Sequence, residues 1–119
     1  MVISKLIEVL ESIGYPVYLQ GSFTEEQEYP DAFFTYWRFD APEPSHYNNQ
    51  AFSCSWGFWI YVYSNNPRAL EQVEQETKKK LKENGFTPVG NWVDSKSDEP
   101  THTGSMLTVR YLETTYKEE

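Results

Sequence analysis

The chain has 119 residues, a length that suits one compact domain spanning residues 1–119. Acidic residues outnumber Lys and Arg by 18 to 10, which gives a net charge of −8. Proteins that grip nucleic acid usually carry a basic patch, so the charge argues against direct, sequence-specific nucleic-acid binding. The apolar runs are short for a membrane span, and the N-terminus lacks a signal-peptide pattern. We therefore expect no membrane contact and retention in a cytosol.

The first segment predicts an amphipathic helix followed by a short strand. Gly14 suits the C-terminal end of a helix, and Pro16 prevents the helix from continuing. Residues 17–23 (VYLQGSF) then favour a strand, and residues 24–31 are acidic and polar, as in a loop. The predicted apolar stripe of the helix consists of Ile3, Leu6, Ile7, Leu10 and Ile13.

Two β-rich segments follow, and both alternate along the chain. In residues 32–39, one face carries Phe33, Thr35, Trp37 and Phe39. In residues 51–64, a predicted core face alternates with a second face that is polar at one end and aromatic at the other. A sheet covered on only one side has this pattern, so Trp59, Tyr61 and Tyr63 are candidate contact residues for a protein partner, unless a helix covers them. The predicted core face of this strand consists of Phe52, Cys54, Trp56, Phe58, Ile60 and Val62.

The connection between these strands, Asp40 to Gln50, contains two prolines and several turn residues. Loops of this length often carry function, although a plain surface loop has the same composition. The loop residues selected as possible protein–protein contacts are Pro42, Glu43, His46 and Tyr47.

The second predicted helix begins after Asn66, which can cap it, and ends at Gly85. Its narrow apolar stripe consists of Leu70, Val73, Thr77 and Leu81. The lysine run Lys78–Lys82 falls near the C-terminal end, where cations complement the helix dipole, so we interpret it as a solvated helix end.

The remaining chain predicts one further strand. Residues 86–94 favour a short extended piece with a turn at Gly90, and residues 105–116 favour the final strand, with Leu107, Val109 and Tyr111 on one face. Together the elements predict an α+β fold. We expect a mainly antiparallel sheet of about four strands with two helices packed on one face, in the order α-β-β-β-α-β.

No catalytic constellation is apparent in the sequence. Asp98 and Glu99 precede His102, a combination that could bind a metal or transfer protons, but Pro100 breaks the helix that would align them. A polar loop before the last strand explains the same residues. Cys54, the single cysteine, fits a buried thiol. We therefore expect no catalytic, cofactor-binding or metal-ligating residues and no enzyme activity. A small ligand-binding or metal-dependent enzyme domain that uses His46 and His102 stays open as an alternative.

Four segments of the chain resemble a known group of proteins: residues 29–52 (YPDAFFTYWRFDAPEPSHYNNQAF), 59–73 (WIYVYSNNPRALEQV), 81–86 (LKENGF) and 98–113 (DEPTHTGSMLTVRYLE). In this order they are similar to small proteins encoded in the tail-assembly region of siphophage and prophage genomes, in particular the tail-terminator, or tail-to-head joining, group of neck proteins.

The resemblance implies a structural role in the virion. Tail terminators are α+β subunits that form a hexameric ring on the end of the tail tube, stop its growth and present a docking face to the head. The implied partners are other copies of the chain, the tail tube protein and the head connector protein. The implied location is the tail and neck of the virion after assembly in the cytoplasm of the bacterial host. Another minor virion protein, such as a minor tail protein, or a small adaptor is the alternative.

Overall fold

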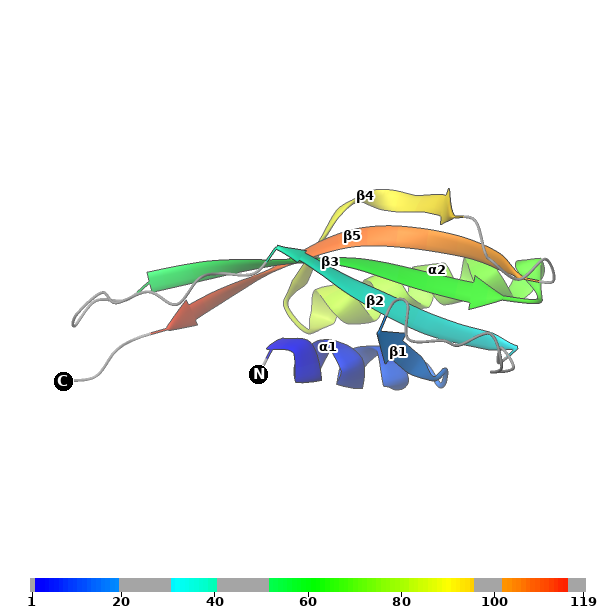
Figure 1. Cartoon of the computed structure of the whole chain (residues 1–119), viewed down its shortest axis with the longest axis horizontal. Coiled ribbons are helices and arrows are strands. Elements are labelled where there is room, and N and C mark those ends of the chain that lie inside the picture. Colours follow the sequence, from blue (N-terminus) through cyan, green and yellow to red (C-terminus); the bar gives the residue numbers. More distant parts are fainter. Residues whose placement is uncertain (1, 20–30, 41–51, 96–101, 116–119) are drawn as a thin grey trace.

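The chain folds into a five-stranded sheet with two helices, an α+β architecture (Figure 1). This computed structural model describes residues 2–19, 31–40, 52–95 and 102–115. The elements in chain order are α1 (Val2–Glu11), β1 (Val17–Leu19), β2 (Ala32–Asp40), β3 (Phe52–Ser64), α2 (Pro67–Glu83), β4 (Phe86–Ser95) and β5 (Thr103–Thr115).

The sheet is mixed, with the strand order β1-β2-β3-β5-β4. β1 runs parallel to β2, and every other neighbouring pair is antiparallel. A parallel neighbour requires a connection of about a dozen residues, and the chain between Leu19 and Ala32 supplies one. The predicted α+β class is therefore confirmed, whereas the predicted count of about four strands and the order α-β-β-β-α-β are wrong.

The strand missing from the prediction is β4. Pro88 and Gly90 indicated a turn, but the segment pairs with β5 at both ends and shifts register between Val89 and Val93. Gly90 adopts a φ of +82° at this irregularity. A bulge accepts such a backbone, and an edge strand tolerates proline, so these two residues shape the strand instead of ending it.

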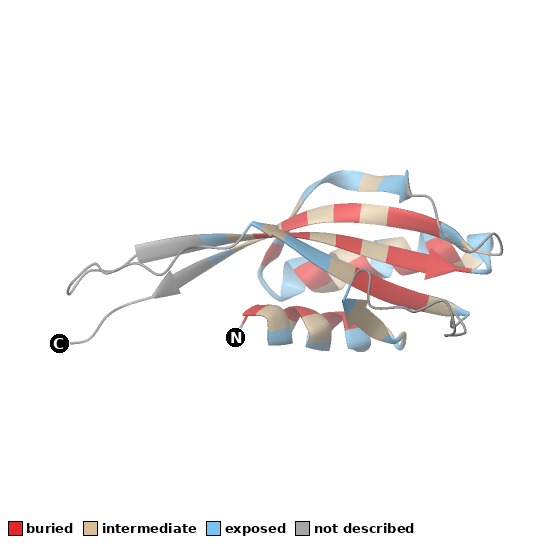
Figure 2. Ribbon diagram, viewed as in Figure 1, coloured by how far each residue is buried: buried red, intermediate tan, exposed pale blue. Residues whose placement is uncertain are grey.

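Both helices pack on the same face of the sheet and share one hydrophobic core (Figures 1 and 2). The sheet contributes alternate residues of its central strands, as the sequence predicted for Phe58, Ile60, Val62, Leu107 and Val109. In α1 the buried stripe differs from the prediction, because Val2 and Val9 are buried with Leu6 and Leu10 while Ile7 is only half-buried.

The second helix forms as its sequence predicts. The side chain of Asn66 accepts a hydrogen bond from the Arg68 backbone at 3.1 Å, and Pro67 occupies the first turn. Gly85 follows the helix with a φ of +90°, a conformation that favours glycine. The four residues of the predicted stripe are the buried ones: Leu70, Val73, Thr77 and Leu81. Neither helix among the described residues is long and apolar enough to cross a membrane.

Side-chain hydrogen bonds hold β4 and β5 against α2. The indole of Trp92 donates to the Glu74 carbonyl at 2.9 Å, and the Ser105 hydroxyl donates to the Glu74 carboxylate. Lys78 Nζ donates to Asn91 Oδ1 at 2.8 Å. These bonds fix the bulged part of β4 beside the helix.

Thr77 supplies a test of the packing between α2 and the sheet. Its side chain is fully buried, and within the described part of the chain its hydroxyl has no hydrogen-bond partner. Replacing an unpaired buried hydroxyl with a methyl group removes a desolvation penalty. Thr77→Val should therefore raise the free energy of unfolding, measured by urea denaturation, by about 1 kcal/mol.

Thr77→Ser is the matched control, because it keeps the hydroxyl and removes the methyl group. It should lower the free energy of unfolding by about 1 kcal/mol. A loss of stability in Thr77→Val would contradict the packing described for α2.

Candidate functional site

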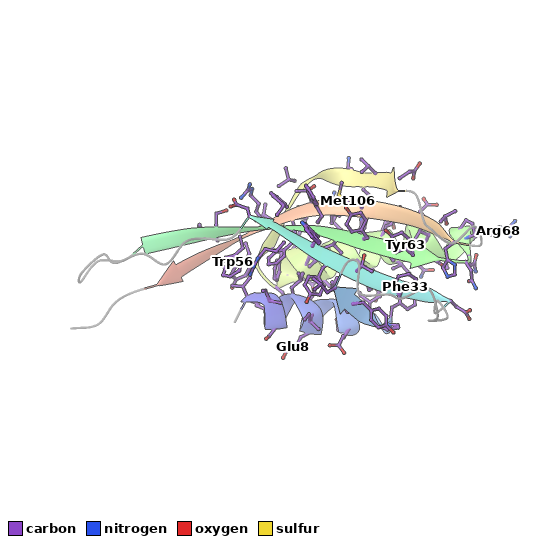
Figure 3. The ribbon with its side chains drawn as sticks, viewed as in Figure 1. Glu8, Phe33, Trp56, Tyr63, Arg68 and Met106 are labelled. Carbon is purple, nitrogen blue, oxygen red and sulfur yellow. The ribbon has the colours of Figure 1, made fainter. Side chains whose placement is uncertain are left out.

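Within the described part of the chain, one face of the sheet carries no helix, and we call it the outer face. Cross-strand partners point to the same side of a sheet, so strand pairing arranges this face in transverse rows. Met106 of the outer face and Trp56 of the helix-covered face lie on opposite sides of the sheet (Figure 3). The first of two central rows consists of Trp37, Trp59, Thr108 and Val89. The second row lies next to the first and consists of Thr35, Tyr61, Met106 and Val93.

Several large apolar side chains of the outer face are exposed to solvent. Trp37 is 46% exposed, and Val89 and Val93 are each 52% exposed. Trp59 and Tyr61, between them in the rows, are half-buried. A single exposed apolar residue is ordinary on a protein surface, but adjoining ones form a patch, and such patches mark interaction sites.

The three aromatic residues selected from the sequence all lie on the outer face, although they differ in exposure. Trp59 and Tyr61 are half-buried and contribute to the patch. Tyr63 is only 7% exposed, and its ring stacks on Phe33 with the ring centroids 5.2 Å apart. Tyr63 therefore offers little contact area. The selected loop residues Pro42, Glu43, His46 and Tyr47 lie outside the described residues.

Sequence reasoning did not select the three most exposed members of the patch. The alternation of residues 32–39 already assigned Trp37 to one face of its strand. The sequence did not show that Trp37 pairs with Trp59, which places both on the outer face. Val89 and Val93 belong to β4, which was not predicted as a full strand. Recognising an edge strand with a bulge in that segment would have placed both valines on the outer face.

At one end of the outer face, the ring of Phe39 folds over the backbone of β3. The register between β2 and β3 shifts between Arg38 and Asp40, which marks a bulge at this point. The ring of Phe39 stacks on Trp59 with centroids 5.0 Å apart. A Cβ atom on Gly57 would lie 2.5 Å from the Phe39 ring, so glycine permits this close approach.

The charged side chain of Arg110 packs near the same Phe39 ring. The Arg110 guanidinium lies 5.3 Å from the centroid of Phe39 and forms an ion pair with Asp40 at 3.0 Å. Arg110 also donates to the Ser55 hydroxyl at 3.1 Å. These contacts join the end of β2 to β3 and β5. The two ion-pair side chains are 42% and 48% exposed, so water weakens their attraction.

Beyond this point β3 and β5 continue as a two-stranded ribbon, which we call the arm: Phe52–Ser55 of β3 and Leu112–Thr115 of β5. β2 pairs with β3 only as far as Gly57, and β4 pairs with β5 only as far as Tyr111. The arm therefore extends away from both helices and from the other strands (Figure 1). Leu112 on the arm is 65% exposed.

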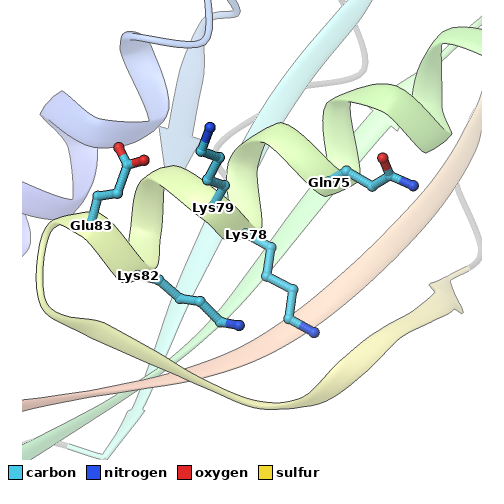
Figure 4. A pocket seen from close by; sticks show the side chains of 5 residues that line it. All are labelled: Gln75, Lys78, Lys79, Lys82 and Glu83. Atoms are coloured by element: carbon cyan, nitrogen blue, oxygen red, sulfur yellow. The ribbon is translucent and has the colours of Figure 1, made fainter.

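The lysines of α2 line a shallow surface pocket together with polar neighbours: Gln75, Lys78, Lys79, Lys82 and Glu83 (Figure 4). Lys78 is engaged with Asn91 of β4, and Lys82 lies in the last helical turn, where the helix dipole favours a cation. These contacts agree with the interpretation of the lysine run as a solvated helix end.

His102 lies next to the start of β5, and its ring is 6.0 Å from that of Phe33. Asp98, Glu99 and Pro100 lie outside the described residues. Among the residues that the structure describes, no group of three or more His, Cys, Asp or Glu side chains is placed to hold a metal ion.

Comparison with known protein families and with curated protein sequences finds no match to this chain. The outer face and the arm are therefore interpreted from their own geometry.

A substitution at Gly57 tests whether the Phe39 ring packs against the backbone of β3. In Gly57→Ala the new methyl group displaces the ring from its stack on Trp59, and we expect the free energy of unfolding to fall by about 1 kcal/mol. In a Phe39→Ala background the clash is absent. There Gly57→Ala should raise the free energy of unfolding by about 0.5 kcal/mol, because glycine in a strand is conformationally costly.

The measurement is a double-mutant cycle by urea denaturation. Equal effects of Gly57→Ala in both backgrounds would show that Phe39 does not pack on this glycine.

Proposed function

We propose that the protein is a structural component of a siphophage or prophage neck, a tail terminator that assembles as a ring on the end of the tail tube. The ring would stop growth of the tube and join the tail to the head. The observation that carries the proposal is the outer face, a sheet surface on which exposed Trp37 of β2 and exposed Val89 and Val93 of β4 are bridged by half-buried residues of β3 and β5. The resemblance of four sequence segments to this group of proteins gives the role its specific form.

A structural subunit requires contact surfaces in more than one direction. The outer face provides one such surface. Burying the exposed apolar side chains of Trp37, Val89 and Val93 against a partner would be favourable, because it removes apolar surface from water. Aromatic residues are enriched at protein interfaces, and Trp59 and Tyr61 adjoin the exposed residues in the same rows. The arm provides a second, separate element for contact.

The charge of the chain fits a channel component. Each copy carries a net charge of −8, and a ring multiplies that charge around its central opening. DNA phosphates are repelled by such a surface, so DNA would pass without adhering to it. The partners that we propose are other copies of the chain, the tail tube protein and the head connector protein.

The proposed role predicts a defect in virion assembly when the protein is missing. Tails made without the gene should vary in length and should fail to join heads, as seen by negative-stain electron microscopy of lysates. Supplying the intact chain from a plasmid should restore tails of uniform length. Uniform, head-joined tails in the absence of the protein would refute the proposed role.

If the outer face serves assembly, substitutions on it should impair tail assembly without unfolding the protein. Trp37→Ser combined with Val93→Ser removes exposed apolar area and should change the free energy of unfolding by only about 0.5 kcal/mol. The same variant should fail to restore tails in the complementation experiment. Leu19→Ser is the matched control, because Leu19 is also 52% exposed but lies on β1. It should restore tails fully, and equal loss of function in both variants would contradict a role for the outer face.

A further inference from the structure

We propose that two copies of this chain pair through an exposed side of α2, with the two helices antiparallel, so that Glu71 of each copy meets Lys82 of the other. This contact goes beyond the proposed function. Subunits around a ring meet through two different surfaces, whereas this contact uses the same surface of both copies. It also leaves the outer face uncovered, because α2 packs on the opposite side of the sheet (Figure 1).

One side of α2 carries a row of polar residues beside the bulged part of β4, and we call this row the polar stripe. Its members follow one another after four, three and four positions, a spacing that places them on a single side of a helix. Lys78 and Lys82 project from this side of α2, and Lys79 projects from another side (Figure 4). The polar stripe consists of Glu71, Gln75, Lys78 and Lys82.

The polar stripe is accessible to a partner. Glu71, Gln75 and Lys82 are exposed, and Lys78 is half-buried, with its ammonium group donating to Asn91 of β4. Two shallow pockets lie along the stripe and share Gln75 and Lys78 in their walls. Within the part of the chain that the structure describes, neither Glu71 nor Lys82 belongs to an ion pair. Both charged ends of the stripe are therefore available for contact with another molecule.

The order of charges along the polar stripe is complementary to itself in the antiparallel direction. The stripe begins with an acid, continues with an amide and ends with two lysines. When two such stripes run antiparallel about a two-fold axis, Glu71 lies opposite Lys82, and Gln75 lies opposite Lys78. A parallel arrangement would bring Lys82 against Lys82, which like-charge repulsion disfavours. The charge order therefore determines the direction in which two copies meet.

The net charge of the chain restricts where two copies can attract each other. Each copy carries a net charge of −8, so two copies repel one another over most of their surfaces. Four of the ten Lys and Arg residues lie within Lys78–Lys82, which makes this segment a site of attraction for an acidic chain. A second copy supplies an acid at the matching place, Glu71 on the same stripe.

The pair that forms in this way is weak. Exposed ion pairs each contribute little to association, and dissolved salt screens them. We therefore expect pairing at high protein concentration and low ionic strength, and separate chains in dilute or salty solution.

Zero-length crosslinking with a carbodiimide tests the arrangement in the natural chain. The reagent joins a carboxylate to an amine only where the two side chains touch. Glu71 and Lys82 of one copy lie about 16 Å apart along the helix, at about 1.5 Å per residue, so a bond between them has to join two copies. At low ionic strength we expect a covalent dimer whose peptides carry the Glu71–Lys82 bond in mass spectra. In about 0.5 M sodium chloride its yield should fall several-fold.

Charge reversal supplies a second measurement, by sedimentation equilibrium. Glu71→Lys alone and Lys82→Glu alone each place like charges opposite one another, so each variant should sediment as a monomer. An equal mixture of the two variants should pair again, because each chain then carries the charges that the other lacks. The variant with both substitutions should pair with itself, and it keeps the net charge of −8.

Glu8→Lys is the matched control for the change in net charge. Glu8 is exposed like Glu71 but lies on α1, so this variant should still pair. Urea unfolding curves establish that every variant is folded before its mass is measured.

Three results would overturn the inference: no dimer of the natural chain at low ionic strength, a dimer in which Lys82 is joined to carboxylates other than Glu71, or single reversals that neither the mixture nor the double variant restores. The neck role is tested separately by tails made without the gene. Uniform, head-joined tails would remove that role and leave the α2 pairing intact, and an absent Glu71–Lys82 bond would do the reverse.

Discussion

The antiparallel ladder between β3 and β5 is the constraint on which the rest of the structure depends. It joins thirteen residue pairs without a break, from Phe52↔Thr115 to Ser64↔Thr103. Because side chains alternate along both strands, this single register assigns every residue of the two central strands to one face or the other. Phe58, Ile60 and Val109 face the helices, while Trp59, Tyr61 and Thr108 face outward. The outer face is therefore a direct product of the same pairing that builds the core.

The ladder is longer than the core that it supports. β2 ends beside Gly57 and β4 begins beside Tyr111, so among the described residues strands flank only part of the ladder on both sides. The bulge at Phe39 and the Arg110–Asp40 ion pair mark this boundary.

Most of the core could be predicted from the sequence, because local periodicity determines it. The stripe of α2 and the alternation of β3 are patterns of a single segment. β4 could not be recognised in this way, since Pro88 and Gly90 mark turns in most contexts and only the pairing with β5 makes them an edge strand. The parallel placement of β1 is also a property of distant segments. The candidate site shows the same division. Alternation along β3 placed Tyr63 on the outer face, but its burial involves contacts with other segments, such as the stack on Phe33 of β2.

The central claim is the proposal that this chain assembles into the tail through its outer face. Amide hydrogen exchange, measured by mass spectrometry on the free chain and on the chain bound to purified tails, tests it most directly. The account predicts that protection increases in peptides covering the exposed outer-face residues Trp37 of β2 and Val89 and Val93 of β4. Exchange in α1 should stay unchanged. Increased protection confined to the helices, or no change around Trp37 and on β4, would contradict the account.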